Sequence, residues 1–162
     1  MLKIAVVDDE IVFVESLINK ITAVCEKLNF EFKIDKYSNG FDILENYSKY
    51  HLIFLDIEMP SIDGIATAKR INKLKSSAEI PFIVYVTSHD ELVFDALKSF
   101  PYSFIRKSKI ESDLYECINR INNSFEELHK TIVLHTERKD IPIVIGLSLI
   151  HISEPTRRTP IS

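Results

Sequence analysis

The fold is decided by one stretch, Ile53-Phe54-Leu55-Asp56-Ile57-Glu58-Met59-Pro60-Ser61-Ile62-Asp63-Gly64. Its first three residues are apolar, which indicates a strand that is buried on both faces. Asp56 follows at the end of this strand, and the Pro and Gly beyond it predict an irregular loop before the next helix. In open α/β sheets, ligands bind at the carboxyl ends of the parallel strands. Asp56 is therefore the first candidate functional residue, with capping of the following helix as the structural alternative.

Two kinds of apolar segment alternate along the chain. Short runs rich in branched residues predict strands, and apolar residues spaced three or four apart predict helices. The expected strands are 2–7, 31–37, 51–56, 82–86 and 102–105, and the expected helices are 13–28, 41–50, 65–77, 90–99 and 114–128. Strands that alternate with helices imply βαβ units and a parallel sheet. Because such crossovers are right-handed, the best fit is an α/β fold with a doubly wound, five-stranded parallel sheet in the order 2-1-3-4-5.

Chemically distinctive residues follow four of the five expected strands. Asp8 and Asp9 follow the first strand, Asp56 the third, Thr87 the fourth and Lys107 the fifth. In the order 2-1-3-4-5 these strand ends share one edge of the sheet. Three crowded carboxylates repel one another and raise their pKa values, and a hard divalent cation such as Mg²⁺ relieves the repulsion. Asp56 is then a candidate nucleophile that forms an aspartyl phosphate, with Lys107 and Thr87 binding phosphoryl oxygens.

Each of these residues also has an ordinary structural interpretation. Asp8-Asp9-Glu10 can cap a helix and favour its dipole. Thr87 can be a β-branched strand end, and Lys107 can be a solvated surface lysine. We favour phosphate chemistry because four separate strand ends carry the residue types that one reaction needs. His89 lies beside Thr87 in the sequence and is expected at the rim of the site, with a small influence on phosphate access.

Composition and charge exclude several other classes of protein. The chain has 162 residues, a formal net charge of −4 and a pI near 5.7, which argues against a free-standing nucleic-acid-binding protein. No apolar run reaches the roughly 18 residues of a membrane-spanning helix. No secretory signal is evident before the first strand, so the expected location is the cytoplasm. Cys25 and Cys117 fall on apolar helical faces and are expected to be reduced core residues.

With these residues assembled, residues 1–125 resemble the receiver domain of bacterial two-component response regulators, a flavodoxin-like fold. The resemblance is carried by the motifs Val7-Asp8-Asp9, Leu55-Asp56-Ile57-Glu58-Met59-Pro60 with Asp63-Gly64, Val86-Thr87-Ser88, and Lys107 after Phe104.

The resemblance implies that a partner histidine kinase phosphorylates Asp56. It implies a Mg²⁺ site formed by Asp9, Asp56 and the backbone carbonyl of Glu58, with Asp8 assisting. It also implies that Thr87 and Phe104 form a switch pair: the hydroxyl moves to the phosphoryl group and the ring swings inward. Such a switch biases a two-state surface around the fourth helix, fifth strand and fifth helix. The phosphorylated form is a candidate homodimer.

One residue departs from the family pattern. Receivers often follow the lysine with Pro, whereas Ser108 follows Lys107 here. A cis peptide before a residue other than Pro is disfavoured by about 3 kcal/mol. The resemblance therefore does not fix the direction in which Lys107 points.

The C-terminal residues suggest a second domain. Residues 130–135 and 140–144 resemble the opening strands of a LytTR-type DNA-binding domain, with a hairpin docked on the receiver as the alternative. The segments Thr87-Ser88-His89-Asp90-Glu91 and Phe100-Pro101-Tyr102 are also similar to regulators of that class, which act in quorum sensing and virulence. Residues 126–146 are thus expected to be a linker and the first strands of a truncated domain. Two strands cannot close a core, so the chain as it stands is not expected to bind DNA.

Residues 147–162 are expected to be non-native. They resemble a translated sequencing adapter, and the alternative is a natural linker rich in Pro and Arg.

Two other functions fit a similar fold less well. A Mg²⁺-dependent phosphatase-like enzyme could use Asp56 as its nucleophile, but haloacid-dehalogenase-type enzymes place a second Asp where this chain has Glu58. A flavin-binding electron carrier needs a hydroxyl-rich loop after the first strand, where Asp8-Asp9-Glu10 would repel phosphate. The expected activity is therefore a switch that is not an enzyme, apart from self-phosphorylation by a phosphodonor and slow autodephosphorylation.

Overall fold

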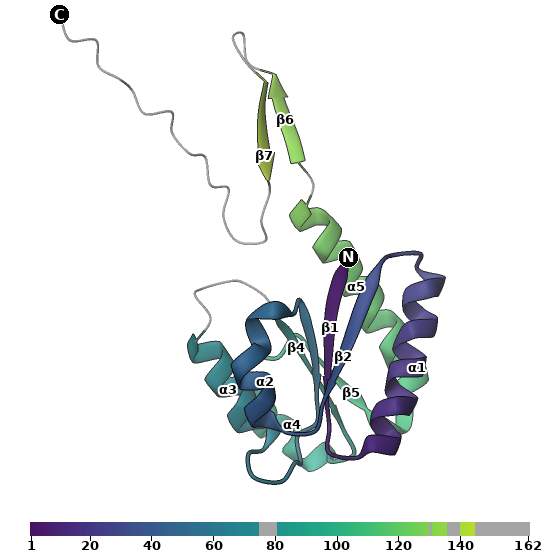
Figure 1. The fold of residues 1–162 in the computed structure, drawn as a ribbon, viewed down its shortest axis with the longest axis vertical. Coiled ribbons are helices and arrows are strands. Elements are labelled where there is room, and N and C mark those ends of the chain that lie inside the picture. The colour runs from purple at the N-terminus through teal and green to yellow at the C-terminus, as the bar shows by residue number, and fades with distance from the viewer. Residues whose placement is uncertain (75–80, 130, 136–139, 145–162) are drawn as a thin grey trace, which may run out of the picture. The chain divides into compact units, whose positions relative to one another are not determined.

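The computed structural model describes residues 1–74, 81–129, 131–135 and 140–144. The chain divides into two units, residues 1–119 and residues 120–162. Strands alternate with helices through the first unit (Figure 1). The strands are β1 (Leu2–Val7), β2 (Phe32–Tyr37), β3 (Leu52–Leu55), β4 (Phe82–Thr87) and β5 (Ser103–Arg106). The helices are α1 (Ile11–Lys27), α2 (Gly40–Asn46), α3 (Gly64–Leu74), α4 (Val93–Leu97) and α5 (Ile110–His129), of which α5 continues into the second unit.

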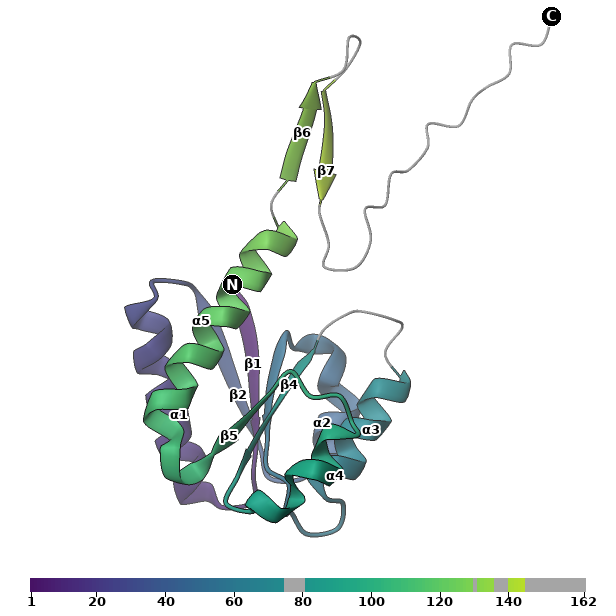
Figure 2. The ribbon, with the colours of Figure 1, turned by 180° about the vertical axis from the view of Figure 1, so that it is seen from behind.

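The five strands form one parallel sheet in the order β2-β1-β3-β4-β5, so the predicted topology is confirmed. Helices α1 and α5 cover one face of the sheet, and α2, α3 and α4 cover the other (Figures 1 and 2). In the second unit, β6 (Thr131–His135) and β7 (Asp140–Val144) form an antiparallel pair. Residues 145–162, which include the segment expected to be adapter sequence, lie outside the described residues.

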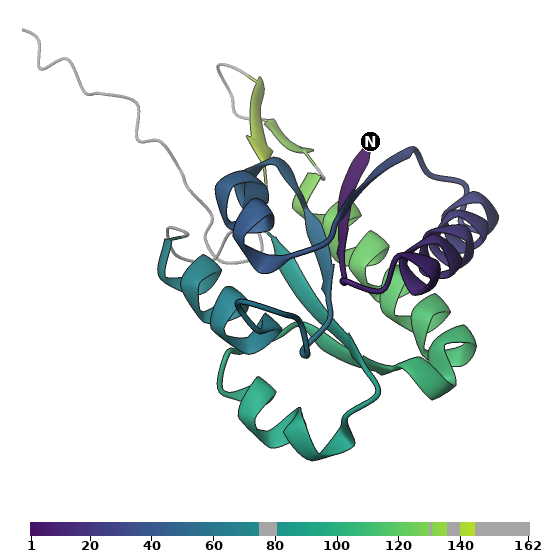
Figure 3. The same cartoon turned by 60° about the horizontal axis from the view of Figure 1, so that its bottom comes forward.

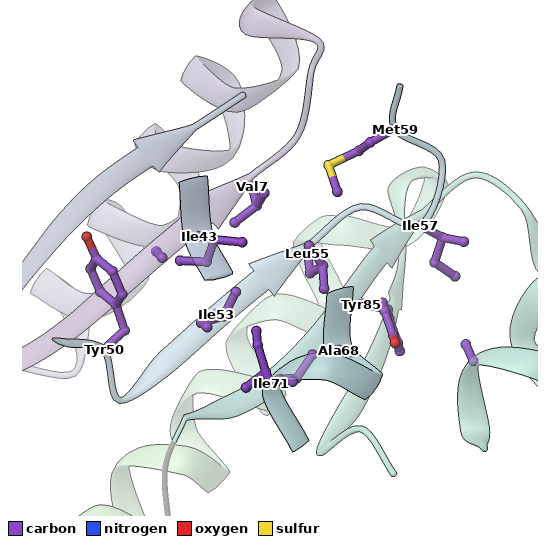
Figure 4. Close-up of a cluster of buried hydrophobic side chains, with 13 residues drawn as sticks. Val7, Ile43, Tyr50, Ile53, Leu55, Ile57, Met59, Ala68, Ile71 and Tyr85 are labelled. Atoms are coloured by element: carbon purple, nitrogen blue, oxygen red, sulfur yellow. The ribbon is translucent and has the colours of Figure 1, made fainter. Parts of the chain in front are cut away.

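The central strand β3 is buried on both faces, as its apolar run predicts. Successive side chains of a strand point to opposite faces. Ile53 and Leu55 therefore pack in a cluster with Ile43 of α2 and Ile71 of α3 (Figure 4). The alternate residues Leu52 and Phe54 are equally buried. This two-sided packing fixes the position at which β3 ends, directly before Asp56.

The loops that follow β1, β3, β4 and β5 all lie at one end of the sheet, which Figure 3 brings forward. Register places them together, because Val7 is paired with Leu55, Leu55 with Tyr85, and Tyr85 with Phe104. The strand ends that the sequence predicts to carry the site therefore lie at the same edge of the sheet.

Two helices are shorter than expected. The second helix ends at Asn46, and residues Tyr47–Lys49 form a 3₁₀ turn. The fourth helix is reduced to Val93–Leu97 after the 3₁₀ turn Asp90–Leu92, and neither start has a side-chain cap. At its end Phe100 takes a left-handed φ of 52° and donates its backbone N–H to Leu97. A non-glycine residue in this region stops the helix.

Two further expectations concern residues away from the site. Cys25 and Cys117 are buried free thiols, as predicted. Within the described part of the chain, none of the helices combines the length and the hydropathy that a bilayer crossing requires.

Two glycines at helix starts predict different costs for the same substitution. A Cβ on Gly64 would lie 2.0 Å from the backbone oxygen of Asp56, which cannot move without displacing the end of β3. A Cβ on Gly40 would instead meet the side chains of Thr67 and Ile62. We expect Gly64→Ala to lower the free energy of unfolding by about 3 kcal/mol and Gly40→Ala by about 1 kcal/mol. Urea denaturation measures the free energy of unfolding of both variants. Equal decreases would contradict the expectation that a clash with the backbone costs more than a clash with side chains.

Candidate functional site

Three carboxylates meet where β1 and β3 end. Asp8 and Asp9 follow β1, Asp56 follows β3, and one oxygen from each lies within 4.8 Å of the others. The backbone N–H of Asp56 donates to the carbonyl of Val7 at 2.9 Å, which ties the two strand ends together. Asp8 is 3% exposed and Asp56 is 6% exposed, whereas Asp9 is open to solvent. The convergence of acids from two separate strands is therefore present.

Lys107 lies against two of these carboxylates. Its Nζ is 2.7 Å from Oδ2 of Asp8 and 3.5 Å from Oδ2 of Asp56, and its side chain is 15% exposed. The alternative that Lys107 is a solvated surface lysine is wrong. The ammonium also lies 4.1 Å from the centre of the Phe13 ring, a contact that sequence analysis did not identify.

Neither buried acid serves as a helix cap. Oδ1 of Asp8 accepts the backbone N–H of Glu10, and Oδ1 of Asp56 accepts that of Ile57, at 2.8 and 2.9 Å. Helix α1 begins at Ile11 without a side-chain cap. Helix α3 is capped by Asp63, which accepts the N–H of Ala66 at 2.7 Å. These bonds fix one oxygen of Asp8 and one of Asp56, and the other oxygen of each faces Lys107.

The charges at this edge are out of balance. Burial, and then the neighbouring charge of Asp8, raises the pKa of Asp56 to about 6, against the opposing effect of Lys107 and the Ile57 N–H. One ammonium offsets only one of three carboxylates. Carboxylate oxygens in a half-open cluster are the ligands that hard divalent cations prefer. The donor set of Asp8, Asp9 and Asp56 therefore fits Mg²⁺ in charge and chemistry.

The loop after β3 has a fixed shape. Ser61 takes a left-handed φ of 73° inside a three-residue turn that the Ile62 N–H closes onto the Pro60 carbonyl at 2.9 Å. The Gly64 N–H donates to the Ile57 carbonyl at 2.8 Å and closes the whole loop. Glu58 lies inside this loop, and its carboxylate points outward to bind His89.

His89 connects two loops at the rim of the site. Its Nε2 is 2.9 Å from Glu58 in the loop after β3, and its Nδ1 is 2.9 Å from Glu91 in the loop after β4. Its backbone N–H donates to the Thr87 hydroxyl at 3.1 Å. The structure thus gives His89 more contacts than the minor role that sequence analysis assigned to it. The hydrogen bond to Glu91, followed by the charge of Glu58, raises the His89 pKa.

The two residues expected to form a switch pair lie on neighbouring strands. Thr87 ends β4 and is fully buried, and Phe104 lies on β5 and is half-buried. The Phe104 ring packs 6.1 Å from the ring of Tyr85, its partner in the β4–β5 register.

The hydrogen bond to Glu91 is the largest cause of the raised His89 pKa, so Glu91 should affect this pKa more than Glu58 does. The imidazolium and its two carboxylate contacts are present below the usual pKa of 6.5 and are lost as pH rises through the higher folded value. We expect Glu91→Gln to lower the His89 pKa more than Glu58→Gln does, measured from the imidazole NMR shifts. Asp90→Asn is the control, because Asp90 contacts Arg106 instead. A pKa that Glu91→Gln leaves unchanged would contradict the bridge.

The raised Asp56 pKa predicts that this carboxylate destabilises the fold when no cation is bound. An acid with a raised folded pKa contributes stability at low pH that is lost as pH rises through about 6. In EDTA, Asp56→Asn should therefore raise the free energy of unfolding, by on the order of 1–3 kcal/mol near neutral pH and by much less near pH 4. Urea titrations across this range measure the difference. A constant difference at all pH values would show that burial of the charge is not its cause.

Comparison with known proteins agrees with this geometry. A family model for the response regulator receiver domain matches residues 4–119. Protein MrkE of Klebsiella pneumoniae is 29% identical over 96 residues, which cover 58% of this chain and 35% of the relative. The sensory transduction protein LytR of Staphylococcus saprophyticus is 28% identical over 108 residues, which cover 65% of this chain and 41% of the relative. The chain spans less than half the length of these two relatives.

Solved structures show the same fold. The response regulatory domain of MrkE matches with a TM-score of 0.66 and 26% identity, over 78% of this chain and 99% of that one. The response regulator domain of Thermotoga maritima CheB matches with a TM-score of 0.61 and 24% identity, over 76% of this chain and 97% of that one, which bears on the fold alone. Because the family model covers well over half of the residues, this chain belongs to the response regulator receiver domains of two-component systems.

Proposed function

We propose that this receiver accepts a phosphoryl group on Asp56 and uses it to switch an output. The observation that supports the proposal best is the environment of Asp56: a buried carboxylate at a strand end, with Asp8 on one side and the Lys107 ammonium 3.5 Å away. A carboxylate with a raised pKa, free of helix capping, is available as a nucleophile once its charge is compensated.

In the proposed reaction, an oxygen of Asp56 attacks the phosphorus of a phosphohistidine. The P–N bond breaks, the imidazole nitrogen takes up a proton, and an acyl phosphate remains on Asp56. Lys107 moves a short distance from the carboxylates to pair with a phosphoryl oxygen. Mg²⁺, held by Asp8, Asp9, Asp56 and the backbone carbonyl of Glu58, supplies further compensation of the phosphoryl charge when bound.

Thr87 and Phe104 are the proposed switch. The Thr87 hydroxyl, which now accepts the His89 N–H, turns to donate to a phosphoryl oxygen. The Phe104 ring, half-buried beside Tyr85, then moves inward into the space that is released. Because both residues lie on the strands next to α4, this movement biases the surface formed by α4, β5 and α5.

An enzyme that acts on outside substrates has no support. A haloacid-dehalogenase-type phosphatase would need a second Asp two residues after Asp56. Glu58 stands there, and its carboxylate is 58% exposed and binds His89. The only reactions that we propose for the chain itself are self-phosphorylation and slow autodephosphorylation.

The family and the relatives support a proposal for the partner and the output. We propose a sensor histidine kinase as the phosphodonor, the cytoplasm as the location of this protein, and a homodimer as a form of the phosphorylated protein. We propose that residues 1–125 are the receiver and that residues 126–146 are a linker and the first strands of a LytTR-type DNA-binding domain. The relative YpdB of Escherichia coli is named as a transcriptional regulatory protein, which supports a transcriptional output. DNA binding would then require the full-length protein. Residues 147–162 remain proposed adapter sequence.

Phosphorylation of Asp56 can be tested with a small phosphodonor. Incubation with acetyl phosphate and Mg²⁺ should give a shifted band in a phosphate-retarding gel, which EDTA abolishes. Asp56→Asn should abolish the band as well, because an amide is not a nucleophile at neutral pH. Asp63→Asn is the matched control, since it makes the same change at an acid that only caps α3. Equal labelling of the wild type and Asp56→Asn would exclude Asp56 as the acceptor.

A further inference from the structure

Lys107 is held from three sides, and only two of them are carboxylates. Asp8 and Asp56 contribute the oxygens at 2.7 and 3.5 Å. On the third side lies the ring of Phe13, whose centre is 4.1 Å from Nζ. A cation within about 6 Å of a ring centre is attracted by the negative ring face, and more strongly when water is largely excluded. With 15% of its side chain exposed, Lys107 meets both conditions.

The lysine needs such a contact because little else directs it. Its four-carbon stem is flexible, and its ammonium is a point charge without a preferred plane. Lys107 opens the 3₁₀ turn Lys107–Lys109, with Ser108 as the next residue. Attraction to carboxylates alone draws the ammonium toward Asp8, which is the nearer of the two.

Phe13 is not explained as a core residue. The buried side chains of α1 are Val14, Leu17, Ile21 and Cys25, which lie at helical spacing. Phe13 stands next to this row and is only half-buried. Together with Lys107 and Ser108, it lines an open hollow of about 720 Å³ between the start of α1 and the start of α5. The ring therefore lies beside Lys107 rather than in the core.

We propose that Phe13 is a positioning residue for phosphoryl transfer: its ring face holds the Lys107 ammonium beside Asp56, where a phosphoryl oxygen arrives. This inference rests on the proposed function of Asp56. A ring face restrains an ammonium to one side without fixing its hydrogen bonds. The ammonium can consequently exchange a carboxylate oxygen for a phosphoryl oxygen while it remains over the ring.

The contact itself can be tested without phosphorylation. The ε-methylene protons of Lys107 lie near the ring face, so the ring current should move their NMR signals upfield. Phe13→Tyr keeps the ring face and should keep this shift. Phe13→Leu keeps an apolar side chain without a ring, and the signals should return to ordinary lysine positions. Signals that are ordinary in the wild type, or unchanged by Phe13→Leu, would overturn the proposal.

The effect on the reaction is tested by a double-mutant cycle with acetyl phosphate as the phosphodonor. Phe13→Leu should slow phosphorylation about three- to tenfold, equivalent to about 0.7–1.4 kcal/mol, and Phe13→Tyr should restore a rate near that of the wild type. In a Lys107→Met background, Phe13→Leu should have no further effect, because the residue acts through the lysine. If Phe13 had only a structural role, Phe13→Leu would slow phosphorylation equally in the wild-type and Lys107→Met backgrounds. That result would overturn the proposal. A wild type that is never labelled would refute the proposed function, whereas the NMR shift still decides the contact.

Discussion

Electrostatic imbalance at one edge of the sheet is the constraint on which the rest of the structure depends. The neighbouring strands β1 and β3 are packed on both faces, and an acid follows each of them at the same end of the sheet. Burial of Asp56, and then the charge of Asp8, raises the pKa of this carboxylate. The packed sheet therefore holds together acids that would separate in an unfolded chain. The repulsion between these acids favours binding of a cation.

The loops around this edge limit how the cluster can relax. Helix capping after β3 is assigned to Asp63, and this leaves Asp56 without that role. The left-handed Ser61 and the close approach of Gly64 to the Asp56 carbonyl hold the loop in one shape. His89 then connects this loop to the one after β4 through Glu58 and Glu91. The backbone N–H of His89 also donates to the Thr87 hydroxyl, so these contacts join the loop after β3 to the end of β4.

The sequence predicts the architecture because its signals are long and repeated. Five apolar runs separated by helical periods leave one favourable strand order, and that order alone brings Asp8, Asp56 and Lys107 together. These patterns do not determine which of two adjacent residues on a helix is buried. Periodicity allows Phe13 or Val14 on the buried row of α1, because neighbouring positions differ by only 100° around a helix. The structure buries Val14, and this leaves Phe13 beside Lys107.

Other features escape sequence analysis for related reasons. The shortening of α4 depends on a left-handed Phe100, a conformation that nothing in its residue type favours. The bridge made by His89 joins residues from two irregular loops, and no spacing rule relates their positions. Such contacts depend on how loops pack after the regular elements are in place.

The pairing of Lys107 with Asp8 also bears on how the protein is made. The two residues are 99 positions apart, and the strands that carry them are separated in the sheet by β3 and β4. Contacts between such distant parts of a chain form late, because the entropy of closing a long loop opposes them. A nascent or partly unfolded chain therefore has the acids without their counter-ion until β5 has joined the sheet.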